Sequence, residues 1–188
     1  MERNVVRPPR ELEALSNREI STCIKDLKHK MGKELLILGH HYQRDEVIEF
    51  ADNRGDSFGL AKLAANSEAK YIVFCGVHFM AETADLITGD DQKVFIPDVT
   101  AGCFLADCAD IKDVKSVWKE LTEITGDVIP VSYVNSDIDL KDFCGRHNGI
   151  TCTSSIADKA MEWAFTRGEK IFFFPDKNLG KNAAHFKM

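Results

Sequence analysis

The side chains best suited to proton chemistry stand directly after a run of apolar residues. Leucine and isoleucine fill positions 35–38, and the chain then continues through Gly39 into His40, His41 and Tyr42. Imidazole and phenol groups can donate, accept and transfer protons. Ligands of parallel sheets bind just beyond the carboxyl ends of the strands. This placement therefore predicts that His40 and Tyr42 belong to a catalytic or binding site.

A second polar pair follows a similar apolar run in the other half of the chain. Residues 129–132 lead into Tyr133 and Asn135, which are separated by one residue and so point to the same side of an extended chain. The pair occupies positions that match those of His40 and Tyr42. It predicts a substrate-orienting role for Tyr133 and Asn135.

Two serines stand where apolar segments with helical spacing begin. The motif GDS, ending at Ser57, precedes FGLAKLAAN, and the motif TSS, centred on Ser154, precedes IADKAMEWA. A serine here can be a simple N-cap, which contributes about 1 kcal/mol. It can also join the backbone amides of the helix N-terminus in holding a carboxylate or phosphate. The two interpretations are compatible, and the sequence leaves both open.

These matching motifs recur in the same order, and YIVFCGVHFMAETA in the first half is likewise answered by KIFFFPDKNLGKNAA in the second. Repetition on this scale indicates two copies of one βα unit. The expected strands are mostly continuous apolar runs, at 34–39, 70–75, 93–97, 128–134, 150–153 and 170–174. The expected helices cover 44–53, 57–66, 79–88, 111–124, 137–146, 155–167 and 178 onward.

Continuous apolar strands are typical of a parallel sheet that helices cover on both faces. We therefore expect an α/β fold of two repeated, Rossmann-like αβα units whose polar strand ends face a shared cleft. Before them, Ser16 and Glu19 have the spacing of a capping box, followed by apolar residues at helical spacing. The expected division is an N-terminal arm and helix, a first αβα unit and a second αβα unit, at 1–32, 33–103 and 104–188.

Composition excludes several classes of function. The 188 residues are 44% hydrophobic and 29% charged, with a formal net charge of −6 and no basic stripe, so nucleic acid is not an expected partner. No apolar run approaches the ~20 residues that cross a bilayer, and the N-terminus does not resemble a secretion signal. The sequence predicts a cytoplasmic protein. It contains neither G-x-G-x-x-G nor a Walker A lysine, so the α/β pattern does not imply NAD or ATP.

The six cysteines include no C-x-x-C pair and are expected to be reduced thiols. Cys23, Cys75 and Cys152 lie within apolar periods and are expected to be small core residues. Cys103 differs because it follows an apolar strand and a turn, at a strand-to-helix junction where a thiolate can be stabilised. An alternative is that Cys103 and Cys108, spaced C-x4-C, belong to a zinc or redox site.

The motifs HHYQ, GDS, GVHFMAET, TAGCFLAD, YVNS, TSS and PDKNLG together resemble the quinolinate synthase family, in the same order and from about residue 33 onward. That family condenses iminosuccinate with dihydroxyacetone phosphate to quinolinate in de novo NAD biosynthesis. The resemblance implies three similar αβα domains around a pseudo-threefold axis. It also implies that one cysteine from each domain holds a 4Fe-4S cluster with one open iron position. The two repeats would be the first two of these domains.

The resemblance also implies the roles of single residues. Cys103 matches the first cluster cysteine, and His40 and Tyr42 match residues that move protons while the iron acts as a Lewis acid. The residues expected to bind substrate are His40, Ser57, Tyr133, Asn135 and Ser154. An L-aspartate oxidase or dehydrogenase that supplies iminosuccinate is an expected partner.

The family's other two cluster cysteines have no match in this chain. We therefore expect the 188 residues alone to be inactive and unable to hold the cluster. The alternative is a non-catalytic module that binds a small dicarboxylate or phosphate.

Overall fold

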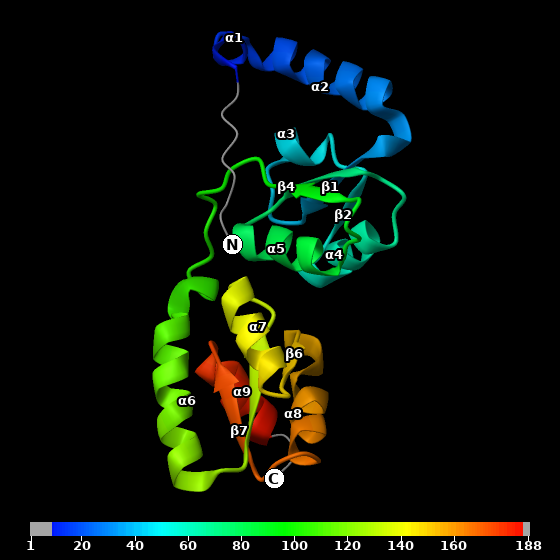
Figure 1. Cartoon of the computed structure of the whole chain (residues 1–188). Coiled ribbons are helices and arrows are strands. Elements are labelled where there is room, and N and C mark those ends of the chain that lie inside the picture. The colour runs from blue at the N-terminus through cyan, green and yellow to red at the C-terminus, as the bar shows by residue number, and fades with distance from the viewer. Residues whose placement is uncertain (1–8, 186–188) are drawn as a thin grey trace. The chain divides into compact units, whose positions relative to one another are not determined.

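A computed structural model describes residues 9–185 of the chain (Figure 1). The chain divides into two compact units, the first ending at Ala101 and the second beginning at Gly102. Each unit is built around its own parallel sheet, which confirms the expected α/β fold. Among the described residues, no helix combines the length and apolar character needed to span a membrane.

The first unit contains a four-stranded sheet in the order β2-β1-β3-β4. Its strands are β1 (Leu35–His40), β2 (Asn53–Gly55), β3 (Tyr71–Cys75) and β4 (Lys93–Phe95). Two helices, α4 (Ser57–Ala65) and α5 (His78–Ile87), pack on each other and against the sheet. The core includes Leu38, Leu60 and Phe79, whose side chains are completely buried. The remaining elements are α1 (Arg10–Glu13), α2 (Asn17–Met31), η1 (Gly32–Glu34) and α3 (Asp45–Ile48).

The second unit contains a three-stranded sheet in the order β6-β5-β7. Its strands are β5 (Val128–Tyr133), β6 (Ile150–Cys152) and β7 (Lys170–Phe174), and its helices are α6 (Ile111–Thr125), α7 (Ile138–Arg146), α8 (Ala157–Phe165) and α9 (Lys177–His185). One core cluster joins α8 and α9 to one face of the sheet, and another joins α6 and α7 to the other face. Two short 3-10 helices, η2 (Ala106–Cys108) and η3 (Ser154–Ile156), complete the unit.

The strand registers show that the two units repeat the same arrangement. Leu38 pairs with Asn53 in the first sheet, and Val131 pairs with Ile150 in the second, each from the fourth position of a six-residue central strand. The registers of β3 on β1 and of β7 on β5 also agree, beginning at Leu35↔Tyr71 and Val128↔Lys170.

The shared register also aligns the serine motifs of the two units. It makes Ser57 equivalent to Ser154, the two serines singled out in the sequence, and the helix-capping residue Asp56 equivalent to Thr153.

The largest difference from the expected elements lies between β1 and α4. The helix expected at 44–53 is only the short α3, and the chain then forms the unexpected strand β2. The sequence of β2 is Asn-Arg-Gly, which carries no apolar residue, and the strand pairs only with β1 at the sheet edge. Because this pairing is made by the backbone, apolar periodicity could not reveal it.

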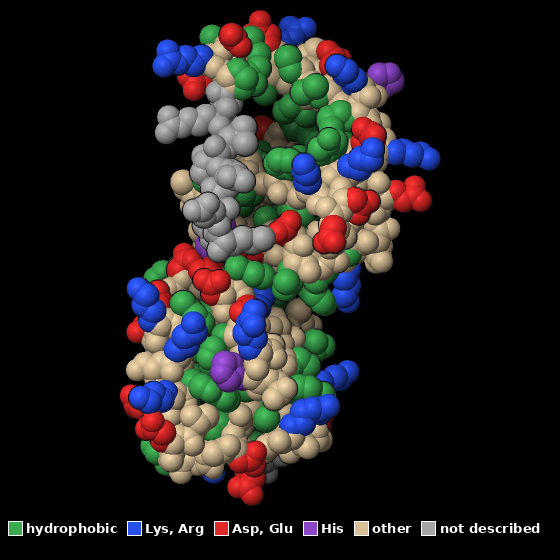
Figure 2. Space-filling model, viewed as in Figure 1, with side chains coloured by type: hydrophobic (Ala, Val, Ile, Leu, Met, Phe, Trp, Pro, Cys, Tyr) green, Lys and Arg blue, Asp and Glu red, His purple; other side chains and the backbone are tan. Residues whose placement is uncertain are grey.

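Helix α2 has the predicted capping box but not a buried face. The Ser16 side chain accepts a hydrogen bond from the backbone N–H of Glu19, and the Glu19 carboxylate accepts one from that of Ser16. No residue of α2 is buried, so the expectation that Cys23 is a core residue is wrong. Figure 2 shows hydrophobic side chains exposed along α2 and in the recess beneath it. Lys28 attaches the helix to the β1–β2 connection through a 2.8 Å ion pair with Asp52.

Candidate functional site

The carboxyl end of β1 carries a compact group of three rings. His40 is the last residue of the strand and is 4% exposed, whereas Tyr42 is 78% exposed. The ring of His40 stacks on that of His41 with 4.2 Å between centroids, and it meets Tyr42 edge-on at 4.1 Å. The Nδ1 atom of His41 lies 3.0 Å from the carbonyl oxygen of Gly55. These contacts fix the group against the neighbouring strand β2.

The environment of His40 keeps its imidazole neutral near pH 7. Burial lowers the pKa of His40 to about 4, and repulsion from His41 acts in the same direction, while the Asp56 carboxylate opposes both. The backbone N–H of Tyr42 donates to Nδ1 of His40 at 3.4 Å. A neutral ring that accepts at Nδ1 carries its proton on Nε2. His40 is therefore a hydrogen-bond donor at Nε2 and a weak base.

Ser57 lies at the same end of the first sheet as His40. His40 pairs with Gly55 across the strands, and Ser57 is the first residue of α4, two positions further along. The helix is capped by Asp56, whose carboxylate accepts a 2.8 Å hydrogen bond from the backbone N–H of Gly59. The interpretation of Ser57 as the N-cap is therefore wrong, because the cap does not use its hydroxyl.

In the second unit, the segment that carries Tyr133 and Asn135 is held by several hydrogen bonds. The backbone N–H of Val134 donates to the carbonyl of Cys152 at 2.8 Å, and the Ser136 hydroxyl donates to the carbonyl of Tyr133 at 2.7 Å. Val134 is buried, while Tyr133 and Asn135 on either side are partly exposed. At the end of β5, the more exposed side chains of Tyr133 and Asn135 thus alternate with the buried Val134, as the sequence predicted.

Lys141 is a residue of this segment that sequence reasoning missed. Its side chain is buried, with 6% exposure, and its Nζ donates to the carbonyl of Ser136. Lysine is almost never buried without a partner. The available signal was its position in α7 between the core residues Leu140 and Phe143, although a lysine at that spacing is ordinarily exposed.

Ser154 takes the position in the second unit that Ser57 takes in the first. It is the first residue of η3, which leads into α8, and Thr153 rather than Ser154 is the residue before the first turn. Tyr133 pairs with Cys152, so Ser154 follows the strand partner of Tyr133 by two residues. The structure thus brings His40, Tyr42 and Ser57 to one sheet end, and Tyr133, Asn135 and Ser154 to the other unit's equivalent end. Whether the two sets share a cleft remains a prediction.

Cys103 lies in the connection between β4 and α6 and is partly exposed. Its carbonyl accepts a 2.9 Å hydrogen bond from the backbone N–H of Asp107. The start of this connection is fixed by His78, whose backbone N–H donates to the carbonyl of Ala101 at 3.0 Å and whose Nδ1 lies 3.3 Å from the same oxygen. His78 is thus a second residue that sequence reasoning left without a role, although it stands in the motif GVHFMAET.

Three of the other cysteines are unsuited to metal binding. Cys75, Cys144 and Cys152 are buried, and burial raises the pKa of each thiol, that of Cys152 to about 12. They remain protonated, whereas thiolates are the metal-binding form. The expectation that Cys75 and Cys152 belong to the core is confirmed.

The pair Cys103 and Cys108 also lacks further support as a zinc site. Within residues 9–185, neither cysteine belongs to a close group of three potential metal ligands. The Cys108 thiol instead donates to the carbonyl of Phe104 at 3.1 Å. A cluster that needs three thiolates does not fit the cysteines described here, of which Cys103 alone follows the expected strand and turn.

Comparisons with known proteins all point to one family. A family model described as "Quinolinate synthetase A protein" matches residues 22–187. The chain is 55% identical over 179 residues to the quinolinate synthase of Geobacillus sp. (strain WCH70) and 53% identical over 179 residues to that of Bacillus cereus (strain B4264). Each alignment covers 94% of this chain and 49% of the relative. The chain therefore spans about half the length of the curated relatives it matches.

Proposed function

Because the chain belongs to the quinolinate synthetase A family, we propose that it is part of a cytoplasmic quinolinate synthase, which condenses iminosuccinate with dihydroxyacetone phosphate to quinolinate. The family match over residues 22–187 carries this proposal. The polar residues at the carboxyl ends of both sheets support it, because that is where parallel sheets bind ligands. An L-aspartate oxidase or dehydrogenase would supply the unstable imine.

In this proposal, His40 binds substrate rather than removing a proton from it. Its neutral Nε2–H can donate to a carboxylate or carbonyl oxygen without the cost of a buried charge. The exposed phenol of Tyr42, packed against the His40 ring, is the better candidate for proton transfer. His40 would therefore orient an oxygen atom of the substrate, and Tyr42 would exchange a proton with that oxygen.

The serines and the second polar pair would hold anionic groups. The N-terminus of α4 presents backbone N–H groups and a favourable dipole beside the Ser57 hydroxyl, a combination that suits a carboxylate or phosphate. Ser154, Tyr133 and Asn135 occupy the corresponding end of the second sheet. Both substrates are anionic, so two such ends match their chemistry.

Cys103 is proposed as one ligand of a 4Fe-4S cluster, which would supply a Lewis-acidic iron when bound. The cysteines described here do not complete the ligand set, so the roles given above for His40, Tyr42 and the serines involve only protons and hydrogen bonds. The missing thiolates would come from the part of the relatives that this chain does not span.

Anaerobic reconstitution with iron and sulfide tests the assignment. The 188-residue chain should form no stable cluster and no quinolinate. A version extended to the length of the relatives should form both, and Cys103→Ser should abolish both, whereas Cys108→Ser should leave both intact. A cluster in the extended Cys103→Ser protein would refute the ligand assignment.

The alternative function is a non-catalytic module that binds a small dicarboxylate or phosphate. One observation favours it: the chain has the predicted polar residues at its strand ends but a single suitable thiol. Calorimetry of the 188-residue chain with malate, phosphate and dihydroxyacetone phosphate addresses it. Binding that persists in an extended protein without turnover would favour the module over the enzyme.

A further inference from the structure

His41 is the member of the three-ring group at the end of β1 to which the proposed function gives no role. It is exposed, beside the buried His40. Its backbone N–H and its ring Nδ1 lie 3.2 and 3.0 Å from the carbonyl oxygen of Gly55. The Arg54 guanidinium donates to the carbonyl of His41 at 3.2 Å. These contacts hold His41 on strand β2, so its ring has a defined position beside that of His40.

The contact with Gly55 determines which nitrogen of the His41 ring carries the proton. A carbonyl oxygen can only accept a hydrogen bond, so Nδ1 of His41 must be the donor. In the neutral ring, Nε2 is then an acceptor. His40 has the opposite arrangement, because its Nδ1 accepts from the backbone N–H of Tyr42 and its proton lies on Nε2. The two stacked imidazoles thus have a donor and an acceptor at the same ring atom.

The acceptor of His41 is available to a ligand. Within residues 9–185, the ring makes no hydrogen bond besides that to Gly55, and its other contacts are with the rings of His40 and Tyr42. Because His41 is exposed, water can satisfy Nε2 in the free protein. A ligand that displaces this water must supply a donor in its place, or the contact is lost without compensation.

From this arrangement we propose that His41 is a specificity-determining residue, which accepts a hydrogen bond from a hydroxyl or imine N–H group of the substrate while His40 donates to the neighbouring carboxylate or carbonyl oxygen. The inference rests on the proposed function, which places substrate at the end of β1. The 4.2 Å between the ring centroids suits groups on adjacent carbon atoms. Iminosuccinate has an imine N–H beside a carboxylate, and dihydroxyacetone phosphate has a hydroxyl beside its ketone, so both belong to the chemical class that this pair would select.

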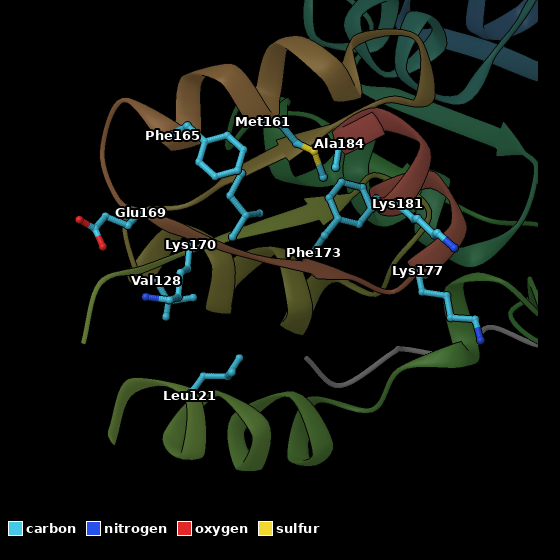
Figure 3. A pocket seen from close by; sticks show the side chains of 12 residues that line it. Leu121, Val128, Met161, Phe165, Glu169, Lys170, Phe173, Lys177, Lys181 and Ala184 are labelled. Carbon is cyan, nitrogen blue, oxygen red and sulfur yellow. The ribbon is translucent and has the colours of Figure 1, made fainter. Parts of the chain in front are cut away.

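A pocket of about 550 Å³ in the second unit is a poorer site for such a molecule (Figure 3). Figure 3 shows that much of its lining is apolar, with Met161 and Phe165 contributed by α8. Lys177 and Lys181 can attract a dicarboxylate there, but the lining contains no histidine and no hydroxyl group. An anion bound in this pocket would not respond to a change at His41, which gives the experiment a rival outcome.

The first test measures the position of the proton. Long-range ¹H–¹⁵N NMR of the unmodified chain, labelled at histidine and kept at pH 8, distinguishes Nδ1–H from Nε2–H in each ring. The proton should lie on Nδ1 in His41 and on Nε2 in His40, and the variants His41→Asn and His40→Gln assign the signals. A proton on Nε2 of His41, alone or together with one on Nδ1, would overturn the inference because no acceptor would remain.

The second test measures the contact itself, by calorimetry of the same chain with malate and succinate. These dicarboxylates carry the same charge and differ only in the hydroxyl group beside one carboxylate of malate. One hydrogen bond to that hydroxyl should make malate bind about fivefold more tightly than succinate. The amide of His41→Asn can keep the bond to Gly55 but leaves no acceptor at the position of Nε2, so the preference should disappear. The amide of His41→Gln reaches that position and should restore most of the preference.

A purely structural role for His41 predicts the reverse order, in which His41→Asn keeps the preference for malate and His41→Gln loses it. That result would overturn the inference, and so would equal binding of malate and succinate to the unmodified chain or no binding of malate. A preference that persists unchanged in both variants would overturn it too, because the anion would then bind elsewhere, as in the pocket beside β7. Neither test depends on turnover, so an extended protein that makes quinolinate would retain the proposed function even if the preference were absent.

Discussion

The neutral state of His40 leads to a prediction that separates its physical causes. Burial lowers the pKa of His40 to about 4, repulsion from His41 adds to the effect, and Asp56 partly offsets it. Removing the second cause with His41→Gln should therefore raise the pKa of His40. Removing the opposing charge with Asp56→Asn should lower it further, and asparagine retains the ability to cap α4.

The same shift makes stability depend on pH. The pKa of His40 is lower in the folded state than the reference value of 6.5, so the unfolded chain binds the proton more readily. The contribution of His40 is complete above pH 6.5 and is lost as the pH falls towards 4. For a fully buried imidazole, this pKa shift would lower the free energy of unfolding by about 3 kcal/mol. Because His40 packs against the exposed Tyr42, water screens part of its charge, and we expect a loss of about 1–2 kcal/mol.

NMR titration of the histidine Cε1–H signals between pH 3 and 8 measures the pKa directly, with His40→Gln used to assign the signal. Urea unfolding at the same pH values measures the free energy, with His40→Gln as the variant in which the loss below pH 6.5 should shrink. A His40 signal that titrates near 6.5, or shifts of the same sign in His41→Gln and Asp56→Asn, would refute the reasoning. His40 would then be available as an ordinary base near neutral pH.

Three further predictions concern the packing around Gly39, the segment 133–137 at the end of β5, and the reactivity of the thiols. Gly39→Ala should destabilise the first unit by about 1–3 kcal/mol in thermal unfolding, because the added Cβ would lie 2.6 Å from Cδ1 of Ile48 and 3.0 Å from Cβ of Ala51, which cannot rotate away. Gly145→Ala meets nothing within 4 Å and should not destabilise. Lys141→Met should speed hydrogen exchange at residues 133–137 and lower the free energy of unfolding by about 1–3 kcal/mol. The control Lys159→Met, at an exposed position, should change neither. Unchanged exchange in Lys141→Met would show that Lys141 does not hold this segment. Iodoacetamide at pH 8 should label the accessible thiols of the folded chain and spare the buried ones. Mass spectrometry should find label on Cys23, Cys103 and Cys108 and none on Cys75, Cys144 and Cys152. Labelling of Cys152 before unfolding would contradict its burial.

The fold was predictable where the strands are apolar along their whole length. The strands β1, β3, β5 and β7 lie within about one residue of the ranges expected from the sequence. Their continuous apolar runs require cover on both faces, which a parallel sheet with two helix layers provides. Edge strand β2 was missed because Asn53 and Arg54 remain exposed and its pairing uses backbone groups, which every sequence carries.

The sequence predicted where the residues of the candidate site lie in the fold, but it did not predict their hydrogen bonds or protonation. The sequence places His40 and Ser57 near strand ends, and the structure agrees, but the choice of Asp56 as the N-cap depends on backbone geometry that the motif GDS does not specify. Likewise, a lysine in α7 gives no sign from sequence that it is buried, and Lys141 is recognisable only once its neighbours are placed.

The repeat itself shows why position does not determine chemistry. His40 and Tyr133 are both the last residue of a central strand, with the same register to their neighbours. The low pKa of His40 arises partly from the next residue, His41, whereas the residue after Tyr133 is the buried Val134. A histidine placed at position 133 would therefore lack the repulsion that helps to keep His40 neutral. The shared framework sets where a side chain lies, and its neighbours set which proton it holds, so equivalent positions in the two units differ in chemistry.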